Sequence, residues 1–116
     1  MNIQQKQRLF YKIIKHLNKK FCKNKILINE IVPFRKGELH KSFPDNHGFY
    51  LNKKKMILIM EAEPLVMQIV ILVHEFVHAY QHQILRYKGK LKHDRIGRKI
   101  NQQFLEEIDK IVKVSM

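Results

Sequence analysis

The hydrophobic positions at the start of the chain repeat at the spacing of a helix. Six apolar residues within residues 3–21 fall on one side of a helical projection, while lysine and glutamine fill the other side. They are Leu9, Phe10, Ile13, Ile14, Leu17 and Phe21. The pattern predicts an amphipathic helix that buries its apolar face.

After residue 25 the pattern changes to short apolar runs that are typical of strands. Residues 26–32 are rich in β-branched side chains, and we expect Pro33 to end this strand. Met56–Met60 is the clearest strand in the chain. Between these runs, turn residues separate short apolar pieces such as Gly48–Leu51, and residues 52–55 favour a hairpin turn.

A long and largely apolar segment, residues 64–87, predicts the main helix of the domain. Pro64 suits the first turn of a helix, and Gly89 stands where the helix is expected to stop. Asp94 is then placed to cap a last helix. The apolar positions of that helix repeat at helical intervals and are Ile96, Ile100, Phe104, Ile108 and Ile111.

The order of these elements predicts the fold class. A helix, a few strands, a long helix and a last helix describe an α+β domain, in which a small antiparallel sheet packs on the long helix between flanking N- and C-terminal helices. A chain of 116 residues is long enough for one core and too short for two of ordinary size. We therefore predict a single domain over residues 1–116.

Composition indicates a basic, cytoplasmic protein. The 23 Lys and Arg outnumber the 10 Asp and Glu, and the resulting formal charge of +13 favours nucleic acid or other anionic partners, although a solvated lysine-rich surface is the alternative. Cys22 is the only cysteine, so an intrachain disulfide and a Cys-rich zinc site are both excluded within this sequence. Residues 1–8 lack the pattern of a signal peptide, and the most apolar run, residues 65–73, is too short to span a membrane.

The segment His74-Glu75-Phe76-Val77-His78 in the long helix is typical of zinc hydrolases. Residues four apart share one face of a helix, so His74 and His78 can bind one Zn²⁺ ion with Glu75 beside them. With a third protein ligand the fourth position stays open for water, whose pKa falls toward neutrality. Glu75 would take the proton of this water as it attacks a peptide carbonyl.

The third zinc ligand is open between two possibilities. His93 follows the long helix and a loop, so the chain can turn back and present it to the same ion, and it is the ligand that we favour. Glu106 or Glu107 on the last helix would complete the site with a carboxylate instead. His82 is one more turn along the long helix, about 12 Å from His74 at 1.5 Å per residue, which is too far to share the ion easily.

Together these residues resemble the SprT-like (Spartan-type) zincin metallopeptidase domain. The resemblance covers roughly residues 26–104 and depends on residues 72–80 and the later histidine, with Met56–Met60 where that family has its small sheet. It implies a zincin-like fold and proteolysis of proteins associated with DNA. The site residues that it implies are the zinc ligands His74, His78 and His93 and the catalytic base Glu75.

A non-catalytic alternative fits the same sequence. A basic module could keep its zinc helix for structure alone and bind nucleic acid or protein. The two hypotheses differ at Glu75, because a structural site needs the histidines but not this carboxylate. If the chain is a peptidase, we expect a strand among residues 48–60 to pair with an extended peptide substrate.

Overall fold

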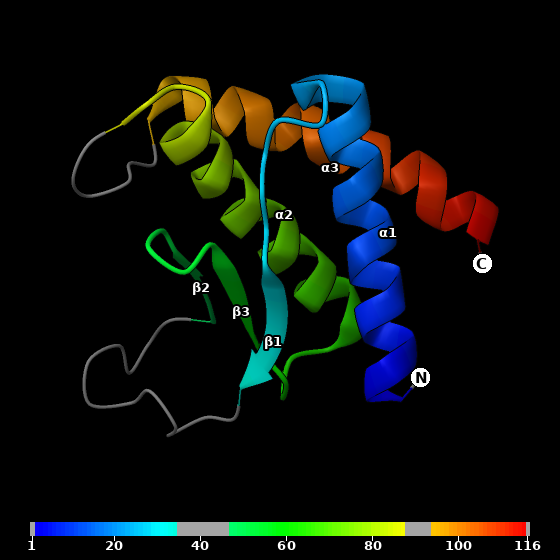
Figure 1. Cartoon of the computed structure of the whole chain (residues 1–116). Coiled ribbons are helices and arrows are strands. Elements are labelled where there is room, and N and C mark those ends of the chain that lie inside the picture. Colours follow the sequence, from blue (N-terminus) through cyan, green and yellow to red (C-terminus); the bar gives the residue numbers. More distant parts are fainter. Residues whose placement is uncertain (1, 35–46, 88–93, 116) are drawn as a thin grey trace.

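The computed structural model describes residues 2–34, 47–87 and 94–115, and in these ranges the chain forms three helices and one sheet (Figure 1). The helices are α1 (Ile3–Cys22), α2 (Leu65–Gln83) and α3 (Arg95–Ser115). The strands are β1 (Glu30–Phe34), β2 (Gly48–Leu51) and β3 (Met56–Met60). This arrangement confirms the α+β class.

The first helix matches its prediction closely. α1 begins at a capping box, in which Asn2 Oδ1 accepts a hydrogen bond from the Gln5 amide (2.8 Å) and Gln5 Oε1 accepts one from the Asn2 amide (3.0 Å). It ends where Lys23 takes a left-handed backbone conformation with φ 53°. The face that packs into the core carries Phe10, Ile13, Ile14 and Leu17.

The sheet is mixed, so the prediction of an antiparallel sheet is wrong for one of its two strand pairs. β2 and β3 pair antiparallel across the predicted turn at residues 52–55, whereas β1 and β3 pair parallel. The strand order is β1-β3-β2. β2 runs opposite to β1, and the hairpin then returns β3 in the direction of β1. Because the largely buried β3 takes the central place, its pairing with β1 has to be parallel.

The bounds of β1 also correct the prediction. Residues 26–29 are not part of the strand, because side chains take up much of their backbone bonding: Asn18 bonds the N–H and C=O of Ile26, and Gln83 bonds those of Leu27. Pro33 lies inside the strand rather than after it. Within the described sheet β1 is an edge strand, where the missing N–H of proline breaks no ladder bond.

The central helix ends earlier than predicted. α2 starts after Pro64 and stops at Gln83, where the amides of Ile84 and Leu85 both bond to the Tyr80 carbonyl (2.9 and 3.2 Å). Arg86, just after the end of α2, has a left-handed backbone conformation with φ 61°. Gly89, where the sequence predicted the end of the helix, lies outside the described residues. Within the described ranges, no helix combines the length and apolar character needed to cross a membrane.

α2 is the element around which the described structure packs. It contacts α1, α3, β2 and β3, and it lies between the sheet and α3 in Figure 1. Its fully buried side chains include Leu72, Val73, Phe76 and Ala79. Because neighbours surround this helix on several sides, its buried side chains are held in fixed positions.

The last helix confirms the predicted cap and most of the predicted apolar face. Asp94 Oδ1 accepts a hydrogen bond from the Gly97 amide at 2.7 Å, which satisfies one of the free N–H groups of the first turn of α3. Phe104 and Ile108 are buried against the core. Ile96 is 54% exposed, so the apolar face begins one turn later than the sequence pattern indicates.

Candidate metal centre

Three side chains of α2 bring possible metal ligands together. His74, Glu75 and His78 each offer one ligand atom, and these atoms lie within 4.8 Å of one another. The two imidazole rings are nearly perpendicular, with centroids 4.8 Å apart and an interplanar angle of 86°. Imidazole nitrogens are ligands that zinc binds in proteins, so His74 and His78 fit a Zn²⁺ ion, with the Glu75 carboxylate close beside them.

The group lies at the boundary between core and surface. Glu75 and His78 are buried, whereas His74 is only partly buried. A catalytic metal needs such a place, because its protein ligands must be held while one position stays open to water and substrate. The burial of His74, Glu75 and His78 is compatible with that requirement.

Burial sets the acid–base character of Glu75. The loss of hydration raises the pKa of its carboxyl group from 4.5 to about 7, because burial disfavours the charged form. Strand β2 passes directly beside it: a Cβ added at Gly48 would lie 3.4 Å from Glu75 Cγ and would collide with Ile71 Cγ2. Glycine at this position lets β2 approach α2 closely.

His78 has a hydrogen-bond partner that sequence reasoning missed. Its Nδ1 lies 2.9 Å from Oε1 of Gln81, one turn further along α2, and both residues are buried. A carbonyl oxygen can only accept, so Nδ1 carries the hydrogen and Nε2 keeps the lone pair that a metal needs. The i to i+3 spacing on one helix face was the available signal in the sequence.

His82 belongs to a different contact. Its Nδ1 lies 2.9 Å from the Tyr50 hydroxyl, and Gln83 Nε2 donates a hydrogen bond to the same hydroxyl at 3.0 Å. Among the described residues His82 is not part of the group that could hold a metal. The contact joins β2 to the C-terminal end of α2 instead.

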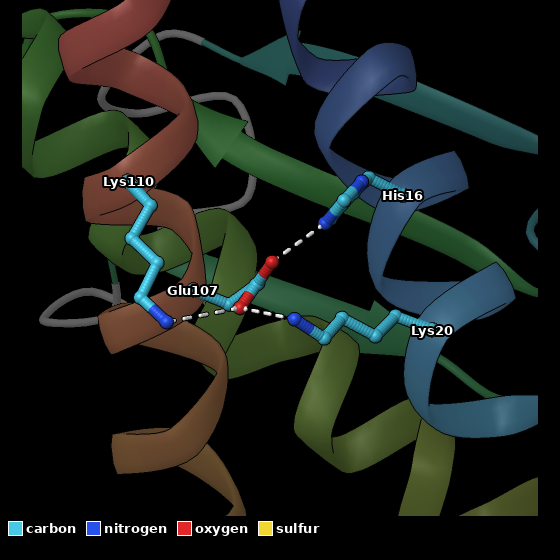
Figure 2. A network of polar contacts seen from close by, with 4 residues as sticks. All are labelled: His16, Lys20, Glu107 and Lys110. Atoms are coloured by element: carbon cyan, nitrogen blue, oxygen red, sulfur yellow. Dashed lines mark hydrogen bonds and ion pairs between the residues drawn. The ribbon is translucent and has the colours of Figure 1, made fainter.

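The structure keeps the two candidate carboxylates away from the metal group. Glu106 is exposed and accepts a hydrogen bond from Gln102 Nε2 at 3.3 Å. Glu107 is buried between α1 and α3, where it bonds to His16 (2.9 Å) and Lys20 (2.8 Å), with Lys110 nearby (Figure 2). Neither joins the metal group formed by the described residues. His93, the favoured third ligand, lies outside the described residues.

The contacts of Glu107 predict a loss of stability in acid. Hydrogen bonds from Lys20 and His16 lower the pKa of its carboxyl group from 4.5 to about 2. A lowered pKa stabilises the folded protein fully above pH 4.5, and this contribution is lost as the pH falls toward 2. Glu107→Gln is therefore expected to lower the free energy of unfolding at pH 7. At pH 3 the stability of the variant should lie closer to that of the wild type, and urea unfolding at both pH values measures the two differences.

A matched control comes from the neighbouring carboxylate. Glu106→Gln changes an exposed side chain and should leave the urea midpoint nearly unchanged at both pH values. Equal effects of the two substitutions would contradict a structural role for the contact between α1 and α3.

Comparison of the chain with protein-family models, with curated proteins and with solved structures finds no match. The SprT-like resemblance therefore depends on the sequence motif alone. The case for a function depends on the geometry of His74, Glu75 and His78 in this chain.

Proposed function

We propose that the protein is a zinc-dependent metallopeptidase with a zincin-like site of the SprT-like type. The observation that supports this function best is the cluster of His74, Glu75 and His78 ligand atoms within 4.8 Å on a helix that is packed on several sides. Ionisable groups in such a position are costly unless a metal or other partners hold them. A zinc ion there would supply a Lewis acid and lower the pKa of a water molecule.

The three residues would divide the work of peptide hydrolysis. His74 and His78 would hold the ion through ring nitrogens, and because neutral imidazoles add no negative charge the metal would stay electrophilic. Glu75 takes the proton of the attacking water and passes it to the nitrogen of the leaving group. Its burial favours this role, because water is displaced from around the group that moves the proton.

His93 is the proposed third ligand, and the residues around it support this choice. The Tyr87 hydroxyl donates a hydrogen bond to Asp94 Oδ2 at 2.7 Å, which joins the two ends of the segment that contains His93. Asp94 then caps α3, and Gly97 in its first turn packs against Gln81, the partner of His78. Asp94, the residue that follows His93, is thus fixed close to α2.

The edge of β2 is the proposed place for an extended peptide. Within the described sheet β2 pairs only with β3, and its first residue, Gly48, lies against Glu75. A peptide that adds to such an edge is held by backbone hydrogen bonds, with little dependence on its side chains. Broad selectivity for unfolded or extended substrates follows from this mode of binding.

Positive charge supports a nucleic-acid partner for the enzyme or for its substrates. The sequence of α1 contains no Asp or Glu, and exposed basic residues recur along it at three- and four-residue intervals at Arg8, Lys12, Lys15 and Lys19. Such a row can contact phosphates, and binding through it would weaken steeply with salt. The same row also favours the second candidate function, a non-catalytic basic module that keeps zinc for structure.

Zinc content tests the proposed site directly. We expect one zinc per chain in the wild type by elemental analysis, with zinc lost from His74→Ala and from His93→Ala. Glu106→Ala should keep its zinc, because Glu106 is exposed and bonded to Gln102 instead. A wild-type protein that binds no zinc after reconstitution would exclude both zinc-based functions.

A further inference from the structure

Gln81 is a polar side chain at a position where a hydrophobic residue would be expected. It has no exposed surface, although it lies in the last turn of helix α2. A buried amide that lacks hydrogen bonds destabilises a protein, so its presence there calls for specific partners. One of them is His78, whose Nδ1 lies 2.9 Å from Gln81 Oε1.

The chemistry of this hydrogen bond decides which ring nitrogen of His78 carries the hydrogen. A neutral imidazole has one N–H donor and one acceptor nitrogen, and an amide oxygen can only accept. Gln81 therefore stabilises the tautomer with hydrogen on Nδ1 and the lone pair on Nε2. Partners of this kind orient metal-binding histidines and raise their basicity, and losing one commonly costs 10- to 100-fold in metal affinity.

Gly97 of α3 leaves the space that the Gln81 amide occupies. A Cβ built at Gly97 would lie 2.6 Å from Gln81 Nε2 and 3.1 Å from Asp94 Oδ1. Gly97 lies in the first helical turn, where alanine would be the better helix former, so the absence of a side chain favours packing and not helix formation. A larger residue at Gly97 therefore requires a shift at this contact, and the end of the Gln81 side chain is the nearest group that can move.

We infer that Gln81 is a positioning residue for the metal centre, which holds His78 with the hydrogen on Nδ1 and the lone pair on Nε2, and that Gly97 couples the packing of α3 to this role. The inference rests on the proposed zinc site, but the tautomer of His78 is a property of the metal-free protein. The fold thus connects two helices through one buried amide: α3 touches Gln81, and Gln81 orients a metal ligand on α2.

The first test replaces the amide with an apolar side chain of similar size. In metal-free Gln81→Leu at pH 8, we expect ¹⁵N NMR of the His78 ring to show a loss of the Nδ1–H tautomer. Zinc affinity, measured by competition with a chelating dye, should fall 10- to 100-fold. In Gln81→Glu, a carboxylate oxygen can still accept from Nδ1, so this variant should retain the wild-type tautomer.

Gln68→Leu is the matched control. Gln68 is also a buried glutamine of α2, but its amide donates to the carbonyls of Glu61 and Glu63 and does not contact His78. This variant should unfold more readily while its His78 spectrum stays unchanged and its zinc affinity stays within about twofold of wild type. If Gln68→Leu lowered zinc affinity as much as Gln81→Leu, removal of any buried polar side chain from α2 would weaken zinc binding, and the inference would be wrong.

The second test acts from α3. Gly97→Ala should weaken zinc binding in the wild-type background and have little effect in a Gln81→Ala background, where the added methyl group meets no amide. Equal effects in both backgrounds, or an unchanged His78 tautomer in Gln81→Leu, would overturn the inference. If wild type binds no zinc while the tautomer still depends on Gln81, the proposed function fails and the positioning contact stands.

Discussion

Glu75→Gln is expected to keep its fold and its zinc and to lose peptide hydrolysis by about 10²- to 10⁴-fold. Glutamine has nearly the same shape as glutamate, so it fills the buried position between α2 and β2 without a new cavity. It cannot take a proton from water, and the catalytic step loses its base. The measurements are the turnover of an unfolded, fluorescently labelled protein, zinc content and circular dichroism.

The control for this variant is Glu106→Gln, which makes the same chemical change at an exposed position of α3 and should retain full activity. Wild-type turnover that survives in Glu75→Gln would contradict the assignment of Glu75 as the base. A wild type that binds zinc and folds but cleaves no protein or peptide would instead favour the non-catalytic module, because that function makes no use of the carboxylate.

Local sequence patterns predicted the elements whose stabilising interactions lie within one segment of the chain. The helical repeat of α1 and the side-chain cap at Asp94 depend on residues within a few positions of one another, and both are present. The hairpin between β2 and β3 follows from a short polar turn between two apolar runs. In each case the interactions that stabilise the element lie within the segment itself.

The pairing of β1 could not be read in the same way. Its parallel register with β3 depends on which strand takes the centre of the sheet, and that choice is made between segments more than 20 residues apart. Residues 26–29 have the composition of a strand, but Asn18 and Gln83 provide bonds to the backbone of Ile26 and Leu27. Contacts with distant side chains overrode the local propensity.

In the candidate site, too, the parts that depend on local sequence were predicted and the parts that depend on distant contacts were not. His74, Glu75 and His78 lie within one helical turn, so helix geometry alone predicts that they come together, as the structure has them. Gln81 is equally close in sequence, but its role depends on a packing gap at Gly97, 16 positions later. The contacts of Glu107 could not be predicted from a local pattern either, because its partners His16 and Lys20 come from the other end of the chain.

In the absence of zinc, Glu75 is expected to make the folded protein less stable as the pH rises from 4.5 to 8. The pKa of Glu75 is about 7 in the folded protein and 4.5 without burial. Below pH 4.5 both states hold the proton and no stability is lost. Between the two values only the unfolded chain releases it, so the free energy of unfolding falls by about 3 kcal/mol and then levels off above pH 7.

Comparison with Glu75→Gln isolates this effect from the other titrating groups. Urea unfolding of both proteins in EDTA at several pH values between 4.5 and 8 should show wild type losing stability relative to the variant across this range. Parallel curves would contradict a carboxyl group whose pKa is raised by burial.

Zinc should reverse the pH effect, and the reversal separates a metal site from a merely buried acid. A cation beside a carboxyl group favours its charged form and so lowers its pKa, while rising pH frees the histidine nitrogens to bind. The zinc-loaded wild type should therefore hold its stability up to pH 8, with the difference from Glu75→Gln much reduced. A buried carboxyl group that weakens the metal-free fold at neutral pH is hard to account for by packing, whereas the proton transfer of a metallopeptidase gives it a use.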